Sequence, residues 1–298
     1  MNINFEKMAT ETRNPNTMNL DQMTPLEIVT VMNQEDALIP KAIEPHLNDI
    51  AQVVEWGVDS VSKGGRIFYM GAGTSGRLGV LDASECPPTF GVKPEVVVGL
   101  IAGGEQAFIK AKEGAEDDRE LGKQDLVDRG LTKDDLVIGL AASGRTPYVL
   151  GGLEYAKEVG CHTAAVTCNA DSILGKTAEV GIDVVIGPEV LTGSTRLKAG
   201  TAQKMILNMF STAIMVGCGK AYSNLMVDVQ QTNEKLVARA RRIVMQATGA
   251  DEQLADEKIR EAGGSCKTAI TMILAGIDAE EAKKRLEAAG GHVRQAIS

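Results

Sequence analysis

The chain has 298 residues, of which 44% are hydrophobic and 24% are charged, and its formal net charge is −9. This length allows one large domain and a smaller one, each with its own core. The acidic balance argues against non-specific binding to nucleic acid or to anionic membranes, and aromatic residues are too few, at 3%, for a base-stacking protein. We therefore expect no nucleic-acid partner and no membrane partner.

Signals for secretion or for a metal site are also missing from the sequence. Residues 1–23 are polar and expected to be loose, without the apolar core of a secretory signal, and no apolar run approaches the roughly 20 residues of a membrane span. The five cysteines are widely spaced without a CxxC, and the three histidines are not paired at helical spacing. We expect a cytoplasmic protein with reduced thiols, no metal and no cofactor.

Residues 24–63 predict helices. Thr24 is suited to cap a helix that begins at Pro25, and Gly64 with Gly65 ends the segment. We assign residues 1–60 to an N-terminal helical segment.

Short apolar runs then alternate with helical patterns. The runs predict strands at 66–70, 95–101, 135–141, 163–167 and 183–187. Nearly continuous apolar runs are typical of strands buried on both faces of a parallel sheet. The intervening segments, among them a largely helical stretch at 107–130, predict crossover helices. The fold class is therefore α/β, a doubly wound parallel sheet of five strands flanked by helices, with ligand sites at the carboxyl ends of the strands.

The last third of the chain predicts helices only. Residues 196–220 and 224–249 predict two long helices, which complete a domain that we place at 61–245. Their apolar residues indicate an oligomer interface. Residues 246–298 predict three short helices separated by glycine pairs, a small helical (UBA-like) domain.

Three polar segments stand after strands or at the start of helices: "GAGTSGR" (71–77), "ASGRT" (142–146) and "TGSTRLKAGT" (192–201). Glycines let backbone N–H groups approach a ligand, hydroxyls donate hydrogen bonds, and a helix N-terminus adds positive potential. This combination suits a phosphate monoester. The candidate binding residues are Thr74, Ser75, Gly76, Arg77, Ser143, Gly144, Arg145, Thr146, Ser194, Thr195, Arg196 and Lys198.

Other interpretations of these segments stay open at this point. "GAGTSG" matches GxGxxG, but the second predicted strand ends in "AGG", without the acidic residue that a dinucleotide site places there. No GxxxxGK[ST] occurs, which argues against a P-loop nucleoside triphosphatase. The segments could also be turns and helix caps alone, and each basic residue could be an ordinary surface charge.

The strand–"GAGTSGR" and strand–"ASGRTP" pattern resembles the sugar isomerase (SIS) fold. Together with "LDASECPPTFG", "EGAEDD", "TGSTRLKAGTAQKMILNM" and "NLMVDVQQTNEKL", it resembles the N-acetylmuramic acid 6-phosphate etherase family over most of residues 24–245. The resemblance implies an enzyme of cell-wall sugar recycling that cleaves a D-lactyl ether without metal or redox cofactor. A phosphosugar isomerase or a phosphosugar-sensing regulator on the same fold would be the alternative.

Two carboxylates match the catalytic glutamates of that family. The resemblance implies that Glu85 donates a proton to the leaving lactate and that Glu116 is the base at C2 of the sugar. Two prolines follow Glu85 and would stiffen the chain. From the residues alone, Glu113, Asp117 and Asp118 would be equally plausible acids or bases. The division of roles between the two glutamates, and whether both face one ligand, stays open.

Overall fold

The computed structural model describes residues 9–110, 112–229 and 234–298. The chain divides into two compact units, the first formed by 1–84 with 95–211 and the second by 85–94 with 212–298. The domain boundaries expected at 60/61 and 245/246 stay predictions. No helix in the described ranges is long and apolar enough to cross a membrane.

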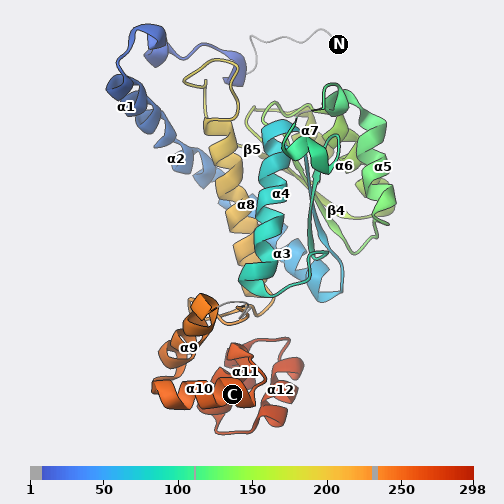
Figure 1. Cartoon of the computed structure of the whole chain (residues 1–298). Helices are drawn as coiled ribbons and strands as arrows, with labels where there is room; N and C mark the ends of the chain where they lie inside the picture. The colour runs from blue at the N-terminus through green and yellow to red at the C-terminus, as the bar shows by residue number, and fades with distance from the viewer. Residues whose placement is uncertain (1–8, 111, 230–233) are drawn as a thin grey trace. The chain divides into compact units, whose positions relative to one another are not determined.

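The first unit is built on a five-stranded parallel sheet of order β2-β1-β3-β4-β5 (Figure 1). The strands are β1 (Ile67–Gly71), β2 (Val97–Ile101), β3 (Leu136–Leu140), β4 (His162–Thr167) and β5 (Val180–Asp183). Four of them lie within two residues of the predicted runs. The strand β5 ends at Asp183, the residue at which the fifth predicted run begins. The carboxylate of Asp183 accepts hydrogen bonds from Thr167 and Ser172 and fixes the chain there. The predicted fold class is confirmed.

Helices cover both faces of this sheet. A Cβ added at Gly79 of α4 (Gly73–Phe90) would lie 2.9 Å from Tyr69 Cβ, and one added at Gly152 of α6 (Pro147–Val159) would lie 2.5 Å from Met70. Successive residues of a strand point to opposite faces, so α4 and α6 cover opposite faces of β1 (Figure 1).

The remaining helices of the first unit are α1 (Pro25–Asp36), α2 (Ile39–Ile43), α3 (Leu47–Ser62), α5 (Arg119–Asp128), α7 (Ile173–Thr177) and the first part of α8 (Lys198–Gly217). Of these helices, α3 and α7 contact strands of the sheet and α5 packs against α6. The helix α8 runs parallel beside α4, since Ser75 bonds to Gln203 and Asp82 to Ser211 (Figure 1).

Three expectations outside the sheet are wrong in detail. Residues 9–22 are not loose: they form short 3-10 turns in which Thr10, Asn14 and Thr17 are buried. The stretch at 107–130, predicted to be largely helical with an interruption at Gly114, is helical only in α5, and the 3-10 turns Glu105–Phe108 and Ala115–Asp117 precede it. The predicted helix at 224–249 begins with a hairpin of β6 (Ala221–Tyr222) and β7 (Leu225–Met226), because Ser223 takes a positive φ of 55° and reverses the chain.

The second unit has its own helical core. Its helices are α9 (Glu234–Thr248), α10 (Glu252–Glu261), α11 (Cys266–Ala275), α12 (Ala279–Ala288) and α13 (Val293–Ala296). The tail after residue 248 thus holds four short helices rather than three, and their buried residues pack in one cluster with those of α9. The predicted helical segment over 230–233 lies outside the described residues.

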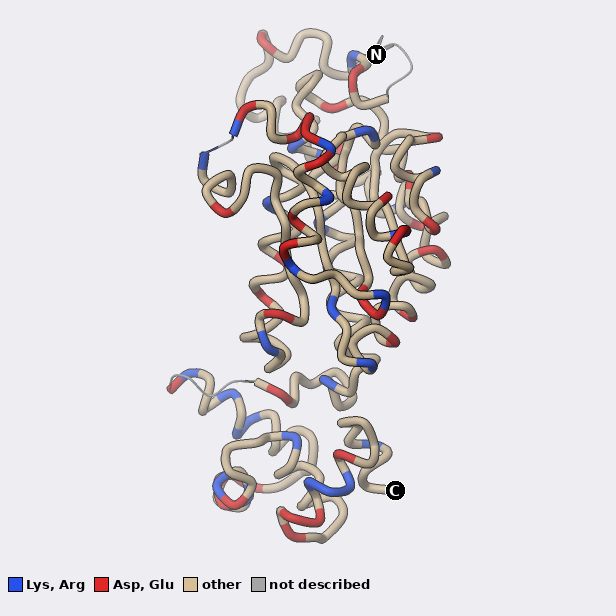
Figure 2. Tube along the Cα trace, turned by 90° about the vertical axis from the view of Figure 1, so that its right-hand side faces the viewer, with Lys and Arg blue, Asp and Glu red and all other residues tan. Residues whose placement is uncertain are grey.

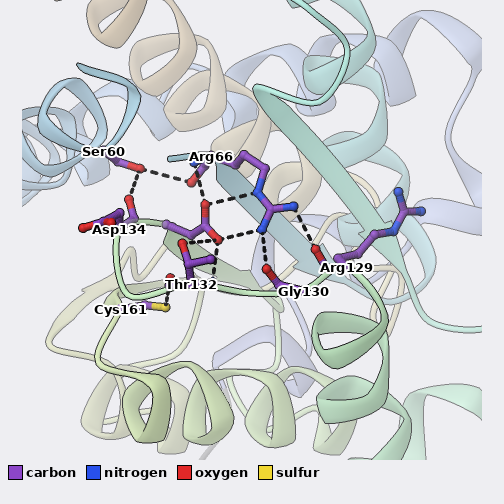
Figure 3. A network of polar contacts seen from close by, with 8 residues as sticks. Ser60, Arg66, Arg129, Gly130, Thr132, Asp134 and Cys161 are labelled. Carbon is purple, nitrogen blue, oxygen red and sulfur yellow. Dashed lines mark hydrogen bonds and ion pairs between the residues drawn. The ribbon is translucent and has the colours of Figure 1, made fainter. Parts of the chain in front are cut away.

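An ion pair joins the start of β1 to the start of β3 (Figure 3). Asp135 is almost fully buried and accepts hydrogen bonds from the backbone and guanidinium of Arg66 and from Thr132. The guanidinium also donates to the carbonyls of Arg129 and Gly130. Burial acts to raise the pKa of Asp135, but the hydrogen bonds outweigh it and the pKa is lowered.

Replacing Asp135 with asparagine is expected to destabilise the protein by roughly 1.5–3 kcal/mol at pH 7, the range for a hydrogen bond to a charged group. Because the pKa of Asp135 is lower in the folded protein than its unfolded value of about 3.9, the ionised carboxylate stabilises the folded state above that pH. This stabilisation is lost as the pH falls through the folded-state pKa. The difference in unfolding free energy between wild type and Asp135→Asn should therefore shrink below about pH 4. Urea titrations at several pH values would measure it; a constant difference would contradict the expectation.

Candidate active site

The loops that follow β1, β2 and β3 leave the sheet at the same edge. Gly71 is in register with Ile101 on one side and with Leu140 on the other, so the three strands end at one level. In strand order 2-1-3-4-5 the chain reverses direction across the sheet beside β1, and such a switch point is where doubly wound folds bind ligands. A cavity of about 200 Å³ opens there. It is lined by Ala72, Gly73, Arg77, Ala102, Ala107, Lys112, Glu113, Gly114 and Glu116.

The expected first phosphate loop is the first turn of a helix. Thr74, Ser75, Gly76 and Arg77 all lie in α4, which begins at Gly73 directly after β1. A Cβ at Gly71 would lie only 2.6 Å from the backbone nitrogen of Gly76, so no larger residue fits this tight strand-to-helix turn. The turn directs the positive end of the α4 dipole toward the strand ends, a favourable place for an anion.

The cavity brings Glu116 together with this turn. Glu116 is exposed on the 3-10 turn Ala115–Asp117, which contacts α6. Arg77 lines the opposite part of the cavity, where its guanidinium donates to the carbonyls of Ala107 and Phe108 at 3.0 and 2.7 Å. Lys112, which the sequence analysis did not single out, adds a cation to the lining.

The second segment follows β3. Ser143, Arg145 and Thr146 are partly buried, and Gly144 takes a positive φ of 71° close to Ser172. The Nε of Arg145 is buried and has no acceptor among the residues that the structure describes. A buried donor without an acceptor is unfavourable by about 1–3 kcal/mol, so this guanidinium is suited to receive an anionic ligand.

The third segment lies beside the first. A Cβ at Gly200, in the first turn of α8, would lie 3.4 Å from Thr74 Cγ2, and the N–H of Gly200 donates to the carbonyl of Thr195. Ser194 and Thr195 are partly buried, whereas Arg196 is exposed. The structure thus places Thr74 next to the turn that holds Ser194 and Thr195.

Lys198 does not face this site. Its side chain is 1% exposed, and its ammonium donates to Glu35 Oε2 at 2.6 Å and to the carbonyl of Ile186 at 3.0 Å. The expectation that Lys198 binds the substrate is therefore wrong, because a buried carboxylate 163 positions away in the sequence already neutralises it.

Backbone N–H groups at the start of α8 already have an acceptor within the chain. The buried carboxylate of Glu189 accepts from the N–H groups of Lys198 and Ala199 at 2.9 and 3.0 Å. Burial raises the pKa of Glu189, and these N–H groups partly offset the rise. The ion pair of Lys198 with Glu35 and the backbone hydrogen bonds to Glu189 fix the segment that carries Ser194 and Thr195.

Glu85 lies elsewhere on α4 and does not line the cavity. It is exposed on the part of α4 that belongs to the second compact unit, whereas the residues that line the cavity belong to the first. The two prolines expected to brace the chain after a short helix lie inside α4, which continues to Phe90.

Basic positions are scattered among acidic ones along the described chain (Figure 2). With a net charge of −9, the overall field opposes an anionic ligand. Local groups must hold such a ligand: the α4 N-terminus, Arg145 and the hydroxyls around them.

Comparisons with known proteins agree with this architecture. A model of the glucokinase regulatory protein N-terminal SIS domain matches residues 49–157, and a SIS domain model matches residues 123–213. The N-acetylmuramic acid 6-phosphate etherase of Serratia proteamaculans (strain 568) is 58% identical over 99% of this chain and 100% of its own. That of Exiguobacterium sp. (strain ATCC BAA-1283 / AT1b) is 58% identical over 98% and 100%.

Solved structures show the same fold at low identity. A phosphoheptose isomerase from Francisella tularensis is 18% identical with a TM-score of 0.50, covering 65% of this chain and 100% of its own. The phosphoheptose isomerase from Neisseria gonorrhoeae is 17% identical with a TM-score of 0.50, covering 64% and 98%. These likenesses concern the sheet and its helices.

Proposed function

Since the chain belongs to the N-acetylmuramic acid 6-phosphate etherase family, we propose how its residues carry out the cleavage. The enzyme is an etherase of cell-wall sugar recycling. Its reaction converts N-acetylmuramic acid 6-phosphate to N-acetylglucosamine 6-phosphate and D-lactate. One observation carries the assignment of residues: a single cavity joins the N-terminal turn of α4, at Gly73 and Arg77, to Glu116.

The bond to be cleaved favours elimination over direct hydrolysis. Opening of the sugar ring exposes an aldehyde at C1, which acidifies the proton at C2. A base removes that proton, the lactyl oxygen leaves C3 with a proton from an acid, and water then adds to the unsaturated aldehyde at C3. These steps need groups that exchange protons in a partly desolvated cavity, which carboxylates can do.

The residues divide into a binding end and a reacting end. We assign the phosphate to the α4 turn with Thr74, Ser75 and Gly76, because these residues lie at the N-terminus of α4, the positive end of its dipole. Arg145, with its unpartnered Nε, is suited to hold an anionic group of the substrate. Further contacts are assigned to Arg77, Ser143, Gly144, Thr146, Ser194, Thr195 and Arg196.

Glu116 is assigned as the base at C2, because it is the carboxylate matched by the family that lines the cavity. Glu85 is assigned as the proton donor to lactate. We also propose a homodimer, in which the site could draw residues from both copies. Cys161, Cys168 and Cys218 are free thiols, which is consistent with the proposed cytoplasmic location.

Incubation of the protein with N-acetylmuramic acid 6-phosphate is expected to release D-lactate. In deuterated, oxygen-18-labelled water, elimination predicts deuterium at C2 and labelled oxygen at C3 of the sugar product. An isomerase would exchange C2 without releasing lactate, and a sensor protein would do neither. Labelled oxygen found only in lactate would overturn the elimination scheme.

A further inference from the structure

The α4 turn contains a hydrogen bond whose direction conflicts with phosphate binding. Ser75 is 7% exposed, and its hydroxyl donates to Gln203 Oε1 at 2.8 Å. Gln203 lies on α8 and is 1% exposed. A hydroxyl has one proton, and a phosphate monoester dianion offers only acceptor oxygens. In this arrangement Ser75 cannot donate to a phosphate oxygen.

The same glutamine carries a donor that is not used. Its Nε2 is buried without an acceptor among the residues that the structure describes. A buried, unpaired donor is unfavourable by about 1–3 kcal/mol. The glutamine therefore presents its acceptor to Ser75 while its donor is unsatisfied, which is the opposite of what an anion-binding serine requires.

A half-turn of the amide would turn its donor toward Ser75 and place its oxygen where the unpaired Nε2 now lies. The torsion that turns a glutamine amide is broad and roughly two-fold, so the two orientations exchange without moving the backbone. After the turn, Nε2 would donate to Ser75 Oγ, and the hydroxyl proton of Ser75 would be free for a phosphate oxygen. The amide nitrogen would gain its missing partner at the same time.

We propose that Gln203 is a positioning residue for the phosphosugar: when substrate binds, its amide turns, Nε2 donates to Ser75 Oγ, and the Ser75 hydroxyl donates to the phosphate. This rests on the proposed function, in which Ser75 contacts the phosphate. An amide can accept a hydrogen bond from Ser75 in the absence of substrate and donate one to Ser75 when substrate is bound. A carboxylate can accept but not donate, and an aliphatic side chain can do neither.

Two substitutions test the proposal in D-lactate release from N-acetylmuramic acid 6-phosphate. Gln203→Glu keeps the shape but can only accept, so it retains the Ser75 proton; KM is expected to rise about tenfold or more, the effect of one hydrogen bond to a charged group. Gln203→Met removes the orienting donor and is expected to raise KM severalfold. In both, kcat should change less than KM. Inorganic phosphate should inhibit more weakly in the same proportion.

The double-mutant cycle with Ser75→Ala separates this role from a structural one. Once Ser75 lacks its hydroxyl, either change at Gln203 should raise KM by less than about twofold. If the effects of Ser75→Ala and of a Gln203 substitution on KM multiply in the double variant, the proposal is overturned. An unchanged KM in both single Gln203 variants would also overturn it. If Ser75→Ala itself leaves KM unchanged, the phosphate contact of the proposed function fails. If Gln203→Glu does not fold, Gln203→Met still tests the proposal, because it removes Nε2, the unpaired donor.

Gln52→Glu provides the control for charge. Gln52 is exposed on α3, so its substitution adds the same negative charge at the surface. Its KM is expected to match that of the wild type. A rise in KM equal to that of Gln203→Glu would assign the effect to net charge and overturn the proposal.

Discussion

Substitution of Glu116 by glutamine is expected to lower the rate of D-lactate release by about 10²–10⁴-fold, the usual contribution of a general base. The amide keeps the size and polarity of the side chain but cannot accept the C2 proton. Exchange of deuterium into C2 should fall by the same factor. Binding of the phosphosugar, measured by calorimetry, should change little, because the phosphate is assigned to the α4 turn rather than to Glu116.

The neighbouring carboxylates sharpen this experiment. Glu113 lines the same cavity, whereas Glu120 is exposed on α5. Glu120→Gln serves as the control and should keep the wild-type rate. If Glu113→Gln abolishes exchange at C2 while Glu116→Gln preserves it, the base is Glu113 and the assignment of Glu116 is wrong.

Substitution of Lys198 by methionine is expected to destabilise the protein by about 3–5 kcal/mol, the range for breaking a buried ion pair from one side. Glu35 would then be a buried carboxylate whose ammonium partner is lost. The pKa of Glu35 is subject to burial, which raises it, and to hydrogen bonds from Lys198 and Asn16, which lower it further than burial raises it. Loss of Lys198 removes the largest of the contributions that lower this pKa. Urea denaturation at pH 7 measures the loss.

The double variant shows whether Lys198 stabilises the fold through its ion pair or contacts the substrate. Glu35→Gln with Lys198→Met removes both charges and should recover a large part of the lost stability, because no uncompensated charge stays buried. Activity should recover with it. A Lys198→Met variant of normal stability whose KM is raised would instead restore Lys198 as a ligand of the substrate.

The strands of the sheet follow largely from local sequence. Four apolar runs became strands within two residues of their predicted bounds, because short, uniformly apolar segments are stable only between two layers of helices. The fifth run was misplaced, since Asp183 bonds to Thr167 and Ser172 and ends the strand early. The motifs around Ser75 and Glu116 predict a phosphosugar site, which stays a prediction.

Tertiary structure decided which residues share the site and which do not. Parallel register brings the ends of β1, β2 and β3 to one edge, so Gly73 and Glu116, more than forty positions apart, line one cavity. The sequence could not show that Lys198 is neutralised by Glu35, because burial and charge pairing depend on partners distant in the chain. The direction of the Ser75–Gln203 hydrogen bond is likewise a property of two packed helices and not of either motif.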